Sequence, residues 1–144
     1  MRVTILAAAL ASFAVASSAA SACQRIGSWP VYFVSGTTRV ADRAETDLLL
    51  QQLRQAMVEE GVQRVQIVGF SDTVPGPAAR RRLAARRADW VRRELLRRGL
   101  RAELLTVVDH GPATRPVPTE DGVRERLNNV ASISFTAERI LPCP

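Results

Sequence analysis

Two oppositely charged residues near the middle of the chain, Asp72 and Arg87, have residue types and surroundings that suit ligand binding. A carboxylate and a guanidinium at one site could hold a polar ligand between them. They could equally form a salt bridge with each other and serve only to stabilise the fold, because such pairs are common in proteins. The sequence around each residue indicates how the two would be positioned.

Asp72 follows a predicted strand. Residues 65–68 alternate in direction within a β-branched, apolar run, which is typical of a buried strand that ends at Gly69. Ser71 and Asp72 come directly after it, and residues 73–77 read Thr-Val-Pro-Gly-Pro, which indicates a loop. In sheets with crossover helices, ligands bind beside the carboxyl ends of strands. Asp72 is therefore expected where a site can form.

Arg87 lies in a predicted helix that runs from about Pro77 to Arg98, with Pro77 in its first turn. Ala84, Ala88, Val91 and Leu95 share one apolar face, and Arg87 lies at its border. An arginine at such a border either extends its charged end to water or pairs with another group. The other arginines fall mostly on the opposite side, which we interpret as solvated rather than as a nucleic-acid patch: Arg81, Arg82, Arg86, Arg92, Arg93 and Arg97.

The segments Gly-Phe-Ser-Asp at 69–72 and Leu-Ala-Ala-Arg-Arg-Ala-Asp-Trp-Val at 83–91 resemble the OmpA C-terminal-like peptidoglycan-binding domain. That family has a G-H-T-D element followed by N-x-x-L-S-x-x-R-A-x-x-V, and the Asp-to-Arg spacing matches without a gap. The resemblance continues from a strand at Val31–Tyr32–Phe33 to Asn128–Asn129, and it covers about residues 30–136.

The resemblance implies that Asp72 and Arg87 bind the free end of meso-diaminopimelate in the peptidoglycan stem peptide. Asp72 would accept hydrogen bonds from the ammonium group, and Arg87 would hold the carboxylate through two parallel bonds. Ser71, Thr73 and Arg80 would contribute with lesser support. The chain departs from the family pattern at Phe70 for His, Ala84 for Ser and Arg80 for Asn, and in the missing arginines of N-R-R-V at 128–131.

The order of predicted elements is β-α-β-α-β-(α)-β. Asp42 and Glu45 resemble a capping box at the start of a helix that ends near Glu60, before Gly61. Further strands are predicted at residues 31–34, 104–108 and 131–135, and residues 119–127 form a short helix or an ordered loop. This order predicts an α/β (α+β) two-layer sandwich, with two helices packed on one face of a mixed four-stranded sheet.

The ends of the chain indicate export. Residues 1–22 read as a signal peptide, with Arg2, an apolar run from Ile5 to Ala16 and a small-residue cleavage site. We expect a linker at 23–29, the OmpA-like domain at 30–136 and a tail at 137–144. The apolar run is shorter than the about 20 residues of a membrane span, and no other stretch could form a transmembrane segment in the mature chain.

The two cysteines, Cys23 and Cys143, leave two alternatives open. In an exported chain they most simply form one disulfide that joins the termini, worth about 4–5 kcal/mol in the chain-entropy model. Alternatively, Cys23 is the first mature residue of a lipoprotein and carries a lipid anchor, although Ala20 replaces the usual Leu three positions upstream.

Composition narrows the function. The formal net charge is +6, all 20 basic residues are arginine, and loss of Arg2 with the signal peptide would lower the charge to +5. Such a chain is attracted to anionic surfaces, but the few aromatic residues do not alternate with arginines, so we expect no nucleic-acid partner. Cofactors, metals and catalysis find no support: His110 is the sole histidine, no acyl-transfer motif or phosphate loop is present, and the cysteines lack metal-ligand spacing.

The leading interpretation is a non-enzymatic protein of the periplasm that tethers the cell wall to the envelope by binding the peptidoglycan stem peptide. It would be associated with the cell wall and the outer membrane, with a possible outer-membrane protein partner. The alternative is an OmpA-like protein-interaction module that has lost the ligand and uses its arginine face. An envelope hydrolase is a weaker third interpretation.

Overall fold

The computed structural model describes residues 28–72, 76–109 and 115–137. The expected signal peptide, Thr73, His110 and both cysteines lie outside these ranges. The described chain has four strands, two long helices and two 3-10 turns. In chain order the elements are β1 (Ser28–Tyr32), α1 (Arg43–Glu60), β2 (Val62–Gly69), α2 (Pro77–Arg97), η1 (Ala102–Leu104), β3 (Leu105–Val108), η2 (Arg126–Asn128) and β4 (Val130–Ala137).

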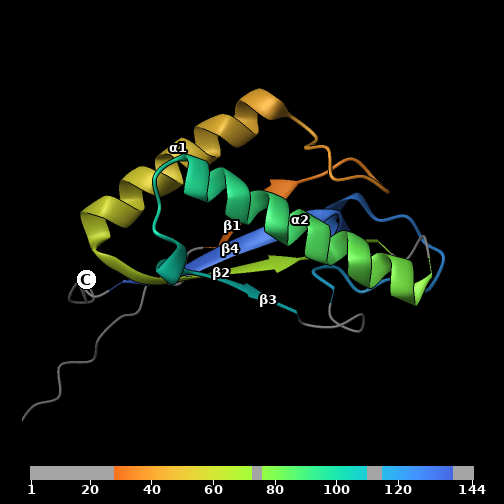
Figure 1. Ribbon diagram of the computed structural model, residues 1–144. Helices are drawn as coiled ribbons and strands as arrows, with labels where there is room; N and C mark the ends of the chain where they lie inside the picture. The colour runs from red at the N-terminus through yellow and green to blue at the C-terminus, as the bar shows by residue number, and fades with distance from the viewer. Residues whose placement is uncertain (1–27, 73–75, 110–114, 138–144) are drawn as a thin grey trace, which may run out of the picture.

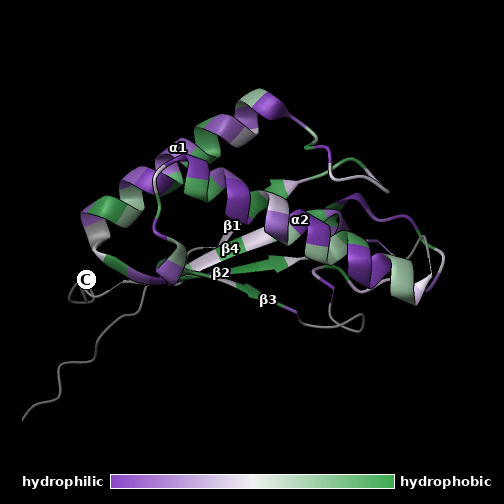
Figure 2. Ribbon diagram, in the orientation of Figure 1, coloured by the Kyte–Doolittle hydropathy of each residue, from purple (hydrophilic) through white to green (hydrophobic). Residues whose placement is uncertain are grey.

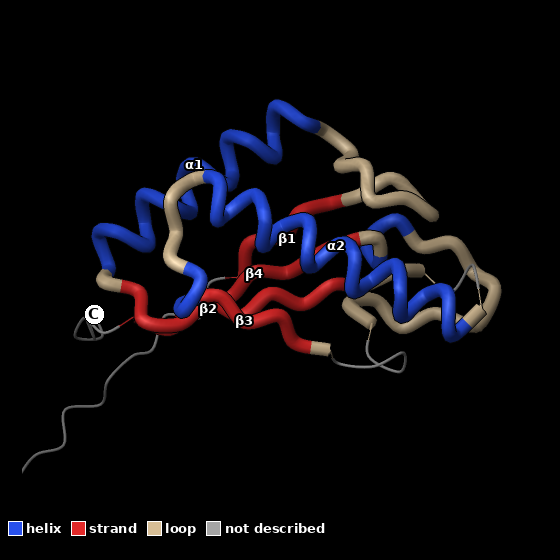
Figure 3. The backbone as a smooth tube through the Cα atoms, in the orientation of Figure 1, coloured by secondary structure: helices blue, strands red, loops and turns tan. Residues whose placement is uncertain are grey.

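The four strands form one mixed sheet in the order β1-β4-β2-β3. β4 lies between β1 and β2 and is antiparallel to both, whereas β3 is parallel to β2. The parallel pair is joined through α2, which crosses over the sheet. Figure 1 shows α1 and α2 on the same face of the sheet, and the backbone tube of Figure 3 shows the same two layers. The predicted fold class is confirmed.

Helix boundaries follow from the expected local signals. The side chain of Asp42 accepts a hydrogen bond from the backbone N–H of Glu45 and caps α1, and Gly61 ends that helix with a positive φ of 64°. Pro77 is the first residue of α2, where a missing N–H is tolerated. After α2, Gly99 has a φ of 86°, which favours glycine.

One predicted strand differs from the structure, and one alternative left open by the sequence is decided. The first strand begins at Ser28 rather than at Val31, because β1 lies at the edge of the sheet, where Pro30 needs no ladder N–H on its outer side. Residues 119–127 form no α-helix; the segment is an ordered loop that ends in the 3-10 turn η2.

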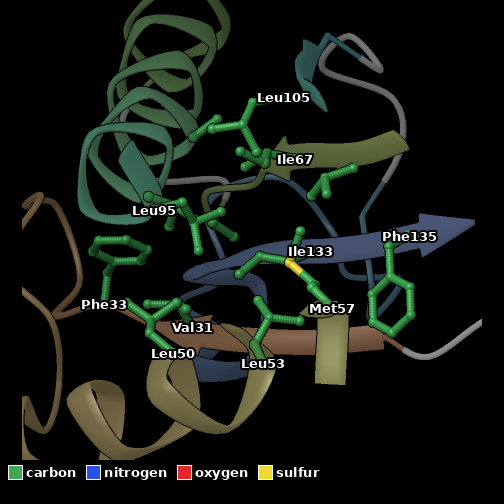
Figure 4. Close-up of a cluster of buried hydrophobic side chains, with 14 residues drawn as sticks. Val31, Phe33, Leu50, Leu53, Met57, Ile67, Leu95, Leu105, Ile133 and Phe135 are labelled. Atoms are coloured by element: carbon green, nitrogen blue, oxygen red, sulfur yellow. The ribbon is translucent and has the colours of Figure 1, made fainter. Parts of the chain in front are cut away.

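The hydrophobic core lies between the helices and the sheet. Figure 4 shows Leu50, Leu53 and Met57 of α1 and Leu95 of α2 meeting Ile133 of the sheet. Figure 2 shows that both helices alternate hydrophilic and hydrophobic residues, as expected for helices with one buried face.

No helix in the described chain is long and apolar enough to cross a membrane.

The end of β2 lies directly against α2. A Cβ atom added at Gly69 would lie 1.9 Å from the carbonyl oxygen of Ala84, which is far inside contact distance. Glycine at this position therefore lets the two backbones approach, and the approach places Arg87 of α2 beside the segment that follows β2.

Candidate functional site

Asp72 lies just beyond β2 and is fully buried, with 0% exposure. Its Oδ2 accepts a hydrogen bond from Ser35 Oγ at 2.8 Å and a second from Asn129 Nδ2 at 2.9 Å. Ser35 comes from the loop after β1, and Asn129 immediately precedes β4. One carboxylate oxygen thus connects three segments that are far apart in sequence.

Arg87 projects from the middle of α2 and is also fully buried. Its guanidinium donates three hydrogen bonds to backbone carbonyl oxygens: Nε to Thr37 at 2.9 Å, Nη1 to Phe70 at 2.7 Å and Nη2 to Val34 at 3.2 Å. Its charged carbon lies 5.3 Å from the centre of the Phe33 ring, a favourable cation–π distance.

Burial lowers the pKa of Arg87 to about 10, and the negative charge of Asp72 partly offsets this effect. The guanidinium therefore stays charged at neutral pH. The effect of Asp72 on this pKa also indicates that the two residues belong to one electrostatic neighbourhood.

Asp72 and Arg87 form no direct salt bridge in the described structure: no nitrogen–oxygen pair between them lies within 4.0 Å. The purely structural ion pair considered from the sequence is therefore not formed. Each residue instead has its own set of partners, carbonyl oxygens for Arg87 and hydroxyl and amide donors for Asp72.

Three buried side-chain atoms of the described chain have no hydrogen-bond partner there: Asp72 Oδ1, Asn129 Oδ1 and Arg80 Nε. Two of them belong to residues that are hydrogen-bonded to each other, Asp72 and Asn129. Buried polar atoms are almost always paired in proteins, so unpaired ones mark places that a ligand or water can complete. The site thus offers two unpaired acceptors on two side chains that are hydrogen-bonded to each other.

The two consecutive asparagines before β4 had no predicted role. For this segment, only the missing arginines of the family pattern were noted from the sequence. Asn129 donates to Asp72 Oδ2 and to the carbonyl oxygen of Glu125. Asn128 exchanges two hydrogen bonds with the backbone of Val117, at 2.8 and 2.9 Å. Both side chains therefore fix the preceding loop next to Asp72.

The three further candidate ligand-binding residues, Ser71, Thr73 and Arg80, lie in different parts of the chain. Ser71 is buried, and its Oγ lies 3.3 Å from the carbonyl oxygen of Asp72. Thr73 lies outside the described residues. Arg80 is in the first turn of α2 and lies 3.7 Å from the exposed carboxylate of Asp121. Ser35, which donates a hydrogen bond to Asp72, was not predicted. The two residues are 37 positions apart, and no local sequence pattern connects them.

A surface hollow of about 450 Å³ lies beside the site rather than at it. Neither Asp72 nor Arg87 lines it. Its lining comes mainly from the loop between β1 and α1, with Trp90 of α2: Val34, Thr38, Arg39, Val40, Ala41, Arg43 and Trp90. Within the described residues no group of three or more His, Cys, Asp or Glu side chains could hold a metal ion.

Residues 32–129 match the OmpA family. The chain belongs to the OmpA family. The matched range includes Asp72, Arg87 and Asn129, and the family resemblance seen in the sequence is confirmed. No curated protein gives a match.

Several solved structures share this OmpA-family fold. The peptidoglycan-associated lipoprotein from Burkholderia pseudomallei superposes with a TM-score of 0.64 at 24% identity, over 74% of this chain and 88% of that one. The periplasmic domain of Helicobacter pylori MotB gives 0.61 at 18% identity, over 81% and 84%. The cell wall anchor of the T6SS from Pseudomonas aeruginosa gives 0.61 at 19% identity, over 80% and 88%.

Proposed function

We propose that this OmpA-family chain binds peptidoglycan non-covalently through the diaminopimelate group of the stem peptide and so tethers the cell wall to the envelope. Asp72 and Arg87 are the principal ligand-binding residues, with lesser contributions from Ser71, Thr73 and Arg80. The proposal assigns no catalytic step and no cofactor to the chain.

The observation that carries the proposal is the pair of unpaired acceptors on Asp72 and Asn129. An ammonium group has three N–H donors and no acceptor, so it can satisfy Asp72 Oδ1 and Asn129 Oδ1 together. A buried carboxylate with one free oxygen is costly without such a partner. The ammonium end of diaminopimelate supplies both the charge and the donors.

The carboxylate end of the ligand falls to Arg87. A guanidinium has five N–H donors, and the described structure uses three of them on the carbonyls of Val34, Thr37 and Phe70. The two remaining donors, one on each terminal nitrogen, are available for a carboxylate. The charge at neutral pH suits that role.

Burial favours the alternative function. Asp72 and Arg87 both have 0% exposure, and the hollow beside Trp90 does not reach them. A ligand can therefore reach the pair only when neighbouring residues move. A chain that has kept the family fold and lost the ligand would keep this buried arrangement for stability, and it would act as a protein-interaction module.

The proposed place of action is the periplasm, between the wall and the outer membrane. Two of the similar structures are named a peptidoglycan-associated lipoprotein and a cell wall anchor, which supports an envelope role. In this proposal residues 30–136 are the binding domain. Attachment to the outer membrane comes from a lipid on Cys23 or from a protein partner, and mass spectrometry of the mature chain distinguishes an acyl group on Cys23 from a disulfide to Cys143.

The test of ligand binding uses Asp72→Asn, which keeps the shape of the side chain. Its amide oxygen can still accept from Ser35 and Asn129, whereas its NH₂ group replaces the acceptor meant for the ligand. We expect the variant to fold and to bind meso-diaminopimelate at least about tenfold more weakly in calorimetric titration, because a charged hydrogen bond is lost. At about 0.5 M NaCl, where exposed charges are screened, pull-down with purified peptidoglycan should weaken in parallel.

Glu103→Gln is the matched control, since it removes one negative charge from an exposed carboxylate near Arg101. It should bind like the wild type. If Asp72→Asn binds as well as this control, or if the folded wild type takes up no diaminopimelate, the tether proposal is wrong and the interaction module is favoured.

A further inference from the structure

We infer that Arg80 and Arg115 form a second anion subsite beside Asp72 and Arg87, and that this subsite binds a second carboxylate of the same stem peptide. The inference rests on the proposed function and extends it from one residue of the ligand to two. The guanidinium of Arg80 is buried and only partly paired.

Arg80 lies seven residues before Arg87 on α2, so the two side chains leave the same face of the helix about 10 Å apart along its axis. Only 9% of Arg80 is exposed, and its Nε has no hydrogen-bond partner in the described chain. Burying a charged donor without a partner is unfavourable. A ligand oxygen at this position would complete it.

Arg115 contacts the same acidic residue as Arg80. Oδ1 of Asp121 lies 3.7 Å from Arg80 Nη1 and 3.8 Å from Arg115 Nη1, and the Asp121 side chain is 88% exposed. One solvated carboxylate thus faces two largely buried guanidiniums, at distances longer than a good hydrogen bond. At such distances, a carboxylate that remains in water contributes little to stability. Asp121 therefore marks where a carboxylate is favoured, and a ligand can displace it.

The loop that carries Arg115 is fixed next to Asp72. Asn128 binds the backbone of Val117 on both sides, and the adjacent Asn129 donates to Asp72. Figures 1 and 3 show this loop beside the first turns of α2, in agreement with the Arg80–Asp121 contact. The two arginines and the Asp72/Arg87 pair are thus parts of one continuous region.

The chemistry of the stem peptide fits this spacing. An extended peptide advances about 3.3–3.6 Å per residue, so 10 Å is the reach of about three residues. A γ-linked glutamate next to diaminopimelate keeps a free α-carboxylate within that reach. Two guanidiniums suit a carboxylate better than the corresponding amide, which has no charge and one acceptor oxygen.

The test compares two tripeptides that differ in one group: L-Ala-γ-D-Glu-meso-diaminopimelate and its glutamate α-amide. In calorimetric titration of the full chain we expect the free acid to bind about tenfold more tightly than the amide. In Arg115→Gln that ratio should fall to about one, while the affinity for the amide stays unchanged. Asp121→Asn removes the competing carboxylate and should raise the affinity for the free acid.

The matched control is Arg81→Gln, which removes the same charge one residue away on the exposed side of α2. It should keep the tenfold preference. Equal binding of acid and amide by the wild type, or an unchanged ratio in Arg115→Gln, overturns the second subsite while leaving the proposed function intact. Failure of the folded wild type to bind either tripeptide overturns both.

Discussion

Arg87 carries a full positive charge in a position with no exposed surface. It remains charged because three carbonyl oxygens and the face of Phe33 replace the water that it lost. These carbonyls belong to the loop after β1 and to the residue after β2, so one side chain joins α2 to both segments. The residue is structural whether or not it also binds a ligand.

This arrangement makes Arg87→Lys a test of geometry at constant charge. The ammonium group of lysine cannot donate to all three carbonyls, because they are positioned around a planar guanidinium. It also loses the contact with Phe33. We expect the free energy of unfolding to fall by about 2–3 kcal/mol, measured by urea denaturation. Arg86→Lys, at the exposed neighbouring position, should change it by less than about 0.5 kcal/mol. Equal effects at the two positions would contradict the structural role of Arg87.

The sequence predicted the two central residues and missed most of their partners. Asp72 and Arg87 were found from a strand end and a helix face, which are local patterns. Their partners are not local: Arg87 bonds to carbonyls 50 and 53 residues away, and Asp72 bonds to Asn129 across 57 residues. Backbone carbonyls carry no sequence signal, so only the fold could reveal them.

At the scale of elements, the contact between β2 and α2 sets the position of Arg87. Gly69→Ala places a methyl group 1.9 Å from the Ala84 carbonyl oxygen, so α2 must shift outward. We expect the free energy of unfolding, measured by urea denaturation, to fall by about 2–3 kcal/mol, because overpacking costs are of this size. Binding of diaminopimelate should also weaken, because the shift of α2 displaces Arg87. Gly76→Ala is the control, since an added Cβ there meets nothing within 4 Å. It should cost less than about 1 kcal/mol.

The two helices are joined by a charge network that the sequence did not reveal. Glu94 of α2 is almost fully buried and faces Arg43 of α1 together with Arg97 and Arg98, and Arg98 reaches Asp47 of α1 at 2.6 Å. Spacing of three and four residues predicts the contacts within α2. The contacts to α1 cross between helices, and no periodicity within one helix indicates them.

This network gives the fold an acid-sensitive contact. Desolvation acts to raise the pKa of Asp47, but hydrogen bonds and charges from Arg43 and Arg98 hold it below the usual 3.8. The unfolded chain therefore takes up this proton more readily, so the contribution to stability is present above pH 3.8 and is lost as the pH falls below it.

Asp47→Asn should accordingly lower the melting temperature at pH 7, and the difference from the wild type should shrink as the pH falls below 3.8 and Asp47 takes up a proton. Glu59→Gln, whose carboxylate accepts a hydrogen bond from Gln55 within α1, is the control and should show a smaller difference at pH 7. A difference between Asp47→Asn and the wild type that persists unchanged at about pH 2 would show that charge is not its source.

Element boundaries were the most predictable part of the fold. The Asp42 cap, the Gly61 stop and the start of α2 at Pro77 each depend on a few adjacent residues, and all three were predicted. The start of β1 was missed because Ser28 and Pro30 are poor strand residues; pairing with β4 outweighs their preferences. The order of strands in the sheet depends on long-range pairing. The order of elements along the chain predicted a mixed four-stranded sheet but not which strands are neighbours.

At the scale of the whole molecule, charge and site would contribute separately to wall binding. The sequence carries a formal charge of +6, and four exposed or half-exposed arginines of α2 have no ion pair within the described ranges: Arg81, Arg82, Arg86 and Arg92. Such a surface attracts anionic polymers without selecting among them. Salt screens exposed charges strongly, since the Debye length falls from about 10 Å at 0.1 M to about 3 Å at 1 M.

Peptidoglycan pull-down over a salt series therefore separates the two contributions. At about 0.05 M NaCl we expect the wild type and Asp72→Asn both to sediment with the wall, because surface charge holds them. At about 0.5 M the Asp72→Asn variant should be released, whereas the wild type keeps most of its binding through the buried site, which salt screens less. The double variant Arg81→Gln with Arg82→Gln keeps the buried site, so at about 0.5 M it should bind like the wild type. Release of wild type and Asp72→Asn at the same salt concentration would mean that surface charge alone holds this protein on the wall.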